Sequence, residues 1–188
     1  MKGGKLFVIS GASGVGKSTI LNLVMSARPD LRFSVSATTR PARKGETEAV
    51  SYYFVSKDRF KEMIQNNEFL EYDAHMGNFY GTPKKQLEEK LSQGSVILDI
   101  EPNGAFNVRK ERPDAVLIFI APPSAEELEK RLRGRGDTPE DQIRLRLDRV
   151  QWEMNQSEKY NYVVVNDQVA HCAQEILNII EKENGEKI

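Results

Sequence analysis

One short loop constrains the fold more than any other part of the chain. Residues 11–18 read Gly-Ala-Ser-Gly-Val-Gly-Lys-Ser and satisfy the pattern G-x-x-x-x-G-K-[ST]. Residues 5–10 before it, with the apolar run 6–9, predict a buried strand, and residues 17–27 after it predict a helix with one apolar face. The alternative is a glycine turn followed by a chance lysine and serine, which needs all fixed positions and both flanking elements to coincide. The sequence therefore predicts a phosphate-binding loop, which we call the phosphate loop.

The chemistry of the phosphate loop follows from its small residues. They let consecutive backbone N–H groups curl around phosphate oxygens, and the helix N-terminus adds further donors and the positive end of its dipole. Lys17 is placed to bridge the β- and γ-phosphates of a nucleoside triphosphate, and the Ser18 hydroxyl is placed to ligate Mg²⁺. The loop predicts a triphosphate and Mg²⁺, but it does not identify the group that receives the phosphate.

The rest of the chain alternates short apolar runs with segments of helical period, which predicts an α/β fold with a largely parallel sheet. Residues 95–100, 115–120 and 162–165 are three further strand candidates. Helices are expected to begin at Ser124, with Glu127 at capping-box spacing, and at Thr138 followed by a proline. A buried stripe is expected on the second of these helices, and another on a last helix from about Val169. The stripe residues are Ile143, Leu147, Val150 and Met154, then Ala173, Ile176, Leu177 and Ile180.

Two segments break this rhythm. Residues 32–93 are mixed, with short strand candidates at 32–36, 52–55 and 69–74, and predict an inserted mixed α/β lobe. Residues 134–137 read Gly-Arg-Gly-Asp between two arginine-bearing helices, and their glycines permit the dihedral changes of a closing lid. We expect one domain over residues 1–188, with a core of 1–31, 94–123 and 159–188, a lobe of 32–93 and a helical lid of 124–158.

Composition narrows the classes of partner. The 27 basic and 28 acidic residues nearly cancel, so no overall field attracts nucleic acid or an anionic membrane. Basic residues gather locally at 40–44 and 131–149, which favours a small anionic ligand. The single cysteine, Cys172, excludes an internal disulfide and a multi-cysteine zinc site. The apolar run 6–9 is too short for a signal peptide or a membrane span. We expect a cytoplasmic protein.

A second group of residues suits a phosphate monoester. Arg40 and Arg43 lie three residues apart, and tyrosines follow at Tyr52 and Tyr53. The planar guanidinium fork meets phosphate oxygens with two parallel hydrogen bonds, and tyrosine hydroxyls can complete the clamp. Taken alone, this segment is equally well interpreted as a solvated basic loop.

Eight motifs together indicate a family. They are, in chain order, the phosphate loop, SATTRPAR at 36–43, NEFLEY at 67–72, GNFYGT at 77–82, ILDIE at 97–101, IAPPS at 120–124, RLRGRG at 131–136 and VVND at 164–167. Each is weak alone, but their common order is specific and spans nearly the whole chain. The sequence closely resembles guanylate kinase, a P-loop nucleoside monophosphate kinase. The resemblance implies a P-loop NTPase core with a parallel sheet flanked by helices, an inserted GMP-binding lobe and a helical lid.

The resemblance also implies an acceptor site. The positions that match its GMP-binding residues are Ser36, Arg40, Arg43, Tyr52, Glu71, Tyr80, Thr82, Asp99 and Glu101. The two arginines and two tyrosines correspond to residues that hold the GMP phosphate. Those that correspond to residues around the guanine are Ser36, Glu71, Thr82 and Asp99. A carboxylate at Glu71 can accept from guanine N1–H and the 2-amino group, and adenine offers neither donor. Apart from the resemblance, Glu71 can be a surface acid on an edge strand, and Tyr52 and Tyr80 can be half-buried strand aromatics.

Two positions near the predicted strand 95–100 leave alternatives open. Asp99 can hold a water bound to Mg²⁺ or reach the guanine amino group, and its spacing does not decide between them. Glu101 is expected on the same side of the strand as Asp99, because strand side chains alternate. The family pattern usually has a glutamine before Gly104, where this chain has Asn103. It also has Ala12 where proline is frequent.

The donor side of the predicted site is larger. Its residues are Gly11, Ala12, Ser13, Gly14, Val15, Gly16, Lys17, Ser18, Thr19, Arg135 and Asn166, with Ser18 as the metal ligand. By resemblance, Arg135 and Arg146 reach the ATP phosphates when the lid closes, and Asn166 lies beside the adenine. Lys17, Arg43, Arg135 and Arg146 are the predicted catalytic residues. The expected reaction is ATP and GMP giving ADP and GDP, and it needs no general base because the acceptor oxygen is already ionised.

Two alternatives remain at this level. Another nucleoside monophosphate kinase would share the phosphate loop and lid, and Ser36 with Glu71 argues for guanine. Guanylate-kinase-like scaffold domains bind peptides without catalysis, but they typically lack an intact phosphate loop, which is complete here. The partners expected are the small molecules ATP and GMP, with no nucleic acid and no membrane. The chain is expected to be a monomer or a weak homo-oligomer.

Overall fold

The computed structural model describes residues 3–75, 77–124, 126, 127, 129, 133 and 140–186. The chain divides into two compact units. The first unit holds the described residues up to Phe7 and Asp30–Ala115, and the second holds Val8–Pro29 and the described residues from Val116 onward. The strand β1 (Leu6–Gly11) starts in the first unit and ends in the second.

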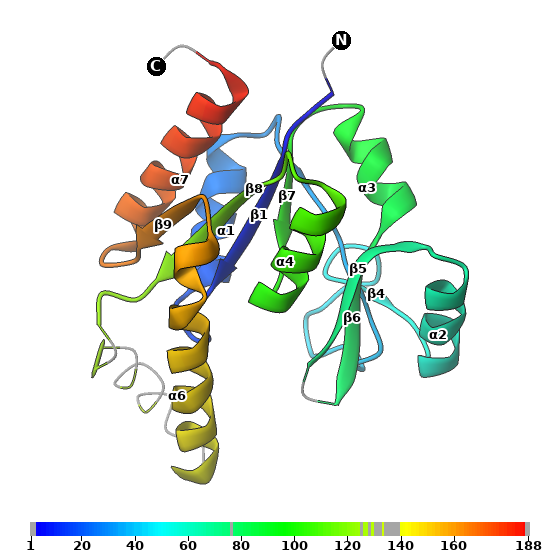
Figure 1. The fold of residues 1–188 in the computed structure, drawn as a ribbon, viewed down its shortest axis with the longest axis horizontal. Helices are drawn as coiled ribbons and strands as arrows, with labels where there is room; N and C mark the ends of the chain where they lie inside the picture. Colours follow the sequence, from blue (N-terminus) through cyan, green and yellow to red (C-terminus); the bar gives the residue numbers. More distant parts are fainter. Residues whose placement is uncertain are drawn as a thin grey trace. The chain divides into compact units, whose positions relative to one another are not determined.

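One part of the first unit is a parallel strand pair with a helix before its second strand and a helix after it (Figure 1). β2 (Arg32–Phe33) pairs with β7 (Val96–Asp99), whose first three residues are buried. Next to this pair, the backbone N–H of Val96 donates to the carbonyl of Lys5 at 2.9 Å. α3 (Lys84–Leu91) precedes β7, and α4 (Pro102–Glu111) follows it with a proline at its first turn.

A separate four-stranded sheet also lies in the first unit, with the order β4-β3-β6-β5. β3 (Ala37–Thr38) and β4 (Tyr53–Phe54) are short, whereas β5 (Phe69–His75) and β6 (Asn78–Pro83) form an antiparallel hairpin. α2 (Lys57–Gln65) begins at Ser56, whose side chain accepts from the N–H of Arg59. The small core of this part stacks Phe60 on Phe69, with ring centroids 4.4 Å apart.

The second unit contains parallel strands in the order β1-β8-β9. β8 (Val116–Ala121) is buried along its whole length and pairs in parallel with β9 (Tyr162–Val165). α1 (Lys17–Ala27) and α7 (Val169–Asn184) lie side by side (Figure 1). α7 buries one face, including Cys172 and Ile176. α6 (Glu140–Asn155) and the 3₁₀ helix η1 (Ser157–Lys159) precede β9.

The α/β class with a parallel sheet flanked by helices is confirmed. The predicted helix 17–27 and the strand 162–165 are found at those bounds, and the other three core strands lie within one residue of the prediction. The predicted strand 32–36 is shorter: β2 ends at Phe33, and the chain then enters β3 of the other sheet. β6 was not predicted as a strand.

The helix signals have mixed outcomes. The N–H of Glu127 donates to the Ser124 hydroxyl at 3.1 Å, the hydrogen bond expected of that cap. Thr138 and Pro139 lie outside the described residues, and α6 is described from Glu140. On its expected stripe Val150 is buried, whereas Leu147 and Met154 are partly exposed and the side chain of Ile143 is not described. Among the described residues, no helix is both long and apolar enough to cross a membrane.

Candidate active site

The phosphate loop lies in the second unit, between β1 and α1. Gly16 is the N-cap of α1 with φ 95°, and Gly14 has φ 85°, so both occupy the left-handed region that favours glycine. Lys17 and Ser18 are the first two residues of α1. The Ser18 side chain is exposed and that of Lys17 is partly exposed, and both lie at the helix N-terminus, where backbone N–H groups favour an anion.

Two buried side chains form hydrogen bonds with the backbone of the phosphate loop. The Asn166 amide donates from Nδ2 to the carbonyl of Val15 at 2.7 Å. The N–H of Ser13 donates to Oε2 of Glu153 on α6 at 2.8 Å. Asn166 was predicted to lie beside adenine, and the structure places its amide on the loop itself, directly after β9.

The structure gives little information on the two arginines predicted for the lid. Arg135 lies outside the described residues. Arg146 lies on α6, and its side chain is not described.

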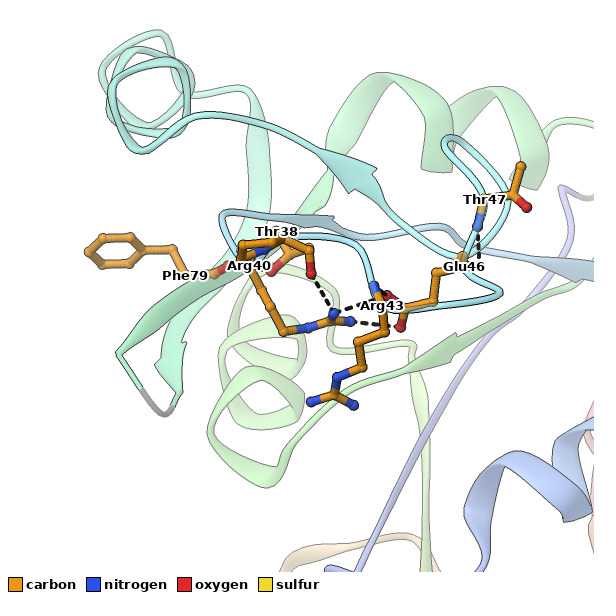
Figure 2. A network of polar contacts seen from close by, with 8 residues as sticks. Thr38, Arg40, Arg43, Glu46, Thr47 and Phe79 are labelled. Atoms are coloured by element: carbon orange, nitrogen blue, oxygen red, sulfur yellow. Dashed lines mark hydrogen bonds and ion pairs between the residues drawn. The ribbon is translucent and has the colours of Figure 1, made fainter.

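On the acceptor side, Arg40 is held by Glu46 in a two-pronged ion pair (Figure 2). Its Nη1 and Nη2 donate to the two carboxylate oxygens at 2.9 and 2.8 Å. The N–H of Arg43 also donates to Glu46, at 2.7 Å. The hydrogen bond from Arg40, and next that from Arg43, lower the pKa of Glu46 to about 2. The same ion pair raises the pKa of Arg40, so both groups stay charged at neutral pH.

The two tyrosines predicted to bind the acceptor phosphate lie close to Arg40 and to each other. The Arg40 guanidinium carbon is 5.4 Å from the centre of the Tyr52 ring. Tyr52 meets Tyr80 edge to face, with centroids 6.0 Å apart. Figure 2 shows the Arg43 guanidinium extending away from Glu46. Three of the four residues predicted to bind phosphate are thus brought together. The fourth, Arg43, is exposed and follows Arg40 by three residues in the same loop.

Glu71 occupies a buried position on β5, opposite Thr82 of β6. The Thr82 hydroxyl donates to its Oε1 at 2.6 Å. Burial raises the pKa of Glu71 to about 7, although the hydrogen bond from Thr82 opposes this rise. A carboxylate with this pKa exists in both protonation states near neutral pH. Glu71 and Thr82 were both predicted to contact the guanine, and their positions do not contradict this prediction.

Gly104 on α4 faces the same carboxylate. An alanine Cβ at this position would lie 2.7 Å from Oε2 of Glu71 and 3.3 Å from its Cδ. Real Cβ atoms essentially never approach another atom within 3.0 Å, so with a Cβ at position 104 the Glu71 carboxylate would have to shift.

The remaining predicted residues are spread along the first unit. Ser36 is buried just before β3, and Asp99 is the last residue of β7. The expectation for Glu101 was wrong in one respect. β7 ends at Asp99 and Glu101 is the N-cap of α4, so strand alternation does not place these two side chains on one side.

Three residues that the sequence reading did not assign contact predicted site residues: Glu46, Gly104 and Glu153. Glu46 had a signal, because it follows Arg43 by three residues. Glu153 also had one, since it falls between Val150 and Met154, on the arc expected to be buried, where a carboxylate needs a partner. No local signal marks Gly104, because Glu71 is far from it in sequence.

Comparison with known proteins identifies the family. The family model described as guanylate kinase matches residues 3–183. Guanylate kinase from Synechococcus sp. (strain JA-3-3Ab) is 47% identical over 92% of this chain and 80% of that protein. Guanylate kinase from Trichodesmium erythraeum (strain IMS101) is 46% identical over 96% and 97%. A crystal structure of guanylate kinase from Anaplasma phagocytophilum superposes with a TM-score of 0.80 at 36% identity, over 97% of this chain and 87% of that one. With an intact phosphate loop and a buried acid at Glu71, the chain belongs to the guanylate kinase family.

Proposed function

We propose that this protein transfers the γ-phosphate of ATP to GMP, giving ADP and GDP, and that Glu71 selects the guanine. The observation that carries the acceptor is the buried carboxylate of Glu71, fixed by Thr82 at 2.6 Å. When ionised, it accepts from guanine N1–H and the 2-amino group. With AMP, the buried acid would face a lone pair instead, and an unmatched polar contact of this kind supports discrimination of about 10⁴-fold.

The GMP phosphate is assigned to Arg40, Arg43, Tyr52 and Tyr80. The ion pair with Glu46 fixes the direction of the Arg40 guanidinium before any ligand arrives, which reduces the entropy lost on binding. The Arg43 guanidinium makes no hydrogen bond or ion pair with any described residue, so its donors remain for ligand phosphates. Ser36, Asp99 and Glu101 complete the proposed acceptor side.

ATP is assigned to residues 11–19, with Lys17 on the β- and γ-phosphates. Asn166 serves this ligand through the loop, because its amide holds the carbonyl of Val15. The exposed Ser18 hydroxyl, in the first turn of α1, fits an Mg²⁺ ion held with the triphosphate. Among the described residues no group of three or more His, Cys, Asp or Glu side chains is placed to hold a metal. When bound, Mg²⁺ neutralises charge on the transferring phosphoryl group.

In the proposed reaction the protein positions the two nucleotides and stabilises negative charge, and no general base is needed. The attacking atom is a phosphate oxygen that is already ionised, so no side chain has to remove a proton. Lys17, with Arg43, Arg135 and Arg146, stabilises negative charge on the transferred group. Excluding water prevents hydrolysis of ATP, which is the role we assign to the lobe 32–93 and the lid 124–158. We further propose a cytoplasmic monomer or weak homo-oligomer without nucleic-acid or membrane partners.

The function is tested by measuring ADP release with GMP, AMP, UMP and dTMP side by side. Turnover with GMP is expected, and activity with AMP but not GMP would overturn the acceptor. Glu71→Gln should weaken GMP binding far more than ATP binding, and equal weakening argues against base reading.

Arg43 is tested in the same assay. Arg43→Met should abolish turnover and leave ATP binding nearly intact. Lys44→Met is the matched control, because it removes an adjacent exposed positive charge. An active Arg43→Met variant would remove the role assigned to this residue.

A further inference from the structure

Glu153 on α6 is a buried carboxylate that the proposed reaction does not use. Among the residues that the structure describes, Glu71 and Glu153 are the two charged side chains classed as buried, and Glu153 is 0% exposed. Taking an ionised carboxylate out of water costs several kcal/mol unless partners replace the lost hydration. Glu71 is explained by the acceptor site. Glu153 therefore needs a different explanation.

The contact that distinguishes Glu153 is made with the phosphate loop. Its Oε2 accepts the N–H of Ser13 at 2.8 Å, across 140 residues of sequence. A hydrogen bond from an amide to a carboxylate is among the stronger kinds in proteins. This N–H is directed at Glu153, so the phosphate-facing donors of the loop are those that follow it. The carboxylate thus fixes the part of the phosphate loop that precedes the phosphate-facing N–H groups.

Asn166 holds the same loop two residues later, at the carbonyl of Val15. Between the two contacts lies Gly14, with φ 85°. One buried side chain accepts from the loop before this glycine, and another donates to it afterwards. The phosphate loop is therefore held by a buried side chain on each side of Gly14, one of its two glycines with positive φ.

We propose that Glu153 is a positioning residue for the donor nucleotide. It holds Ser13 so that the N–H groups of residues 14–18 converge on the ATP phosphates. It also fixes helix α6 to the loop. Arg146 lies on the same helix, two turns before Glu153. This inference rests on the proposed donor site at the phosphate loop.

The test compares two substitutions in the full-length protein. Glu153→Met keeps the length of the side chain and removes the acceptor, whereas Glu153→Gln keeps an oxygen acceptor at the same reach. The dissociation constant of a non-hydrolysable ATP analogue with Mg²⁺ is measured by calorimetry, and that of GMP in parallel. Glu153→Met should raise the constant for the analogue about 10-fold, because the Ser13 N–H loses its partner. Glu153→Gln should stay within about threefold, and GMP binding should not change in either variant.

Gln151→Met on the exposed side of α6 is the control, and it should bind the analogue like the unmodified protein. A purely structural role predicts a lower unfolding temperature for Glu153→Met with unchanged analogue binding, and that result would overturn the inference. Equal weakening of GMP binding, or equal losses in the Met and Gln variants, would overturn it as well.

Two further measurements keep the inference testable. If Glu153→Met does not fold, amide hydrogen exchange at Ser13 is compared between the unmodified protein and Glu153→Gln. Faster exchange in the variant is expected, because an amide oxygen is a weaker acceptor than a carboxylate, and unchanged exchange would contradict the inference. Lys17→Ala tests the donor site separately. If Lys17→Ala weakens the analogue and Glu153→Met does not, only the role of Glu153 fails; if neither does, the donor site itself is wrong.

Discussion

Gly104 on α4 faces Oε2 of Glu71, at a distance that leaves no room for a side chain: a Cβ there would lie 2.7 Å away. Thr82 holds the other carboxylate oxygen, Oε1, at 2.6 Å. The Glu71 carboxylate, the proposed reader of the base, is therefore bounded by a hydroxyl on one oxygen and by a bare helix backbone at the other. Its position depends on the glycine as much as on the threonine.

The first prediction concerns Gly104→Ala. Glycine to alanine inside a helix ordinarily stabilises a protein by about 0.5–1 kcal/mol. Here the new methyl group displaces Glu71, so we expect a loss of stability of about 1–3 kcal/mol instead. The KM for GMP should rise about 10-fold while the KM for ATP stays unchanged. Steady-state kinetics with each substrate varied in turn, together with urea unfolding, measures both effects.

Asn103→Ala is the matched control for this prediction. Asn103 is exposed and precedes Gly104 on the same helix. It should leave both KM values near those of the unmodified protein. A Gly104→Ala variant with unchanged KM for GMP would show that the position of Glu71 does not matter to the acceptor.

The second prediction is a dependence of stability on pH. Burial raises the pKa of Glu71 from 4.5 to about 7, so between these values the folded protein binds more protons at this site than the unfolded chain. The contribution of Glu71 to the free energy of unfolding therefore falls as pH rises through this window, by about 3 kcal/mol in all. Glu71→Gln should lack this decline. Urea unfolding of both proteins at several pH values from 4.5 to 8 checks the difference, and parallel curves would contradict the prediction.

The third prediction concerns GMP affinity and pH. The proposed contact with guanine requires ionised Glu71, so a group with a pKa of about 7 must lose its proton when GMP binds. GMP should bind about 10-fold more weakly at pH 6 than at pH 8 through this group. Calorimetry at pH 7 in buffers of different ionisation enthalpy should show proton release with GMP. In Glu71→Gln this release should disappear, apart from the contribution of the GMP phosphate.

The fourth prediction concerns Glu46→Ala. Without this carboxylate, Arg40 loses both hydrogen bonds that fix its guanidinium. The KM for GMP should rise about 10-fold, because the arginine must then be ordered on binding. Glu62→Ala is the control: it removes the same charge from an acid paired with Arg59 on α2. Similar kinetics in the two variants would mean that net charge, rather than the orientation of Arg40, governs GMP binding.

The fifth prediction concerns Asn166→Asp. The substitution replaces the Nδ2 donor by an oxygen, which would face the carbonyl of Val15 at 2.7 Å. Two acceptors at this distance repel each other, so the phosphate loop should shift and the KM for ATP should rise about 10-fold or more. Asn178→Asp makes the same chemical change at an exposed position of α7 and should have no effect. Unchanged ATP kinetics in Asn166→Asp would show that the loop keeps its shape without this amide.

The sequence predicted the parts of the fold that depend on local patterns. The phosphate loop, α1, β9 and the buried face of α7 are specified by short motifs and by residue period, so their bounds were found within one residue. The inserted segment was harder. β2 and β3 are two residues long and belong to different sheets, whereas a single strand was expected over 32–36 and none over β3. Their separation depends on pairing with β7 and β6, which no local pattern records.

The candidate site divides in the same way. Arg40, Tyr52 and Tyr80 were predicted together and lie together, as do Glu71 and Thr82. The contacts of Gly104 with Glu71 and of Glu153 with Ser13 join residues that are distant in sequence. The helix and strand periods of the sequence therefore do not predict them. Glu101 was misplaced relative to Asp99 because a proline begins α4 at the next residue and ends the extended pattern.

The buried Cys172 on α7 has a practical consequence for observing this protein at work. Burial, and then the nearby acids Glu175 and Asp167, raise the pKa of its thiol to about 12, so almost none of the reactive thiolate forms near neutral pH. It is also the one cysteine of the sequence. A maleimide dye added to Lys44→Cys, beside the proposed GMP phosphate site, should therefore label that position alone. Fluorescence from this single dye can report nucleotide binding without first replacing the native thiol.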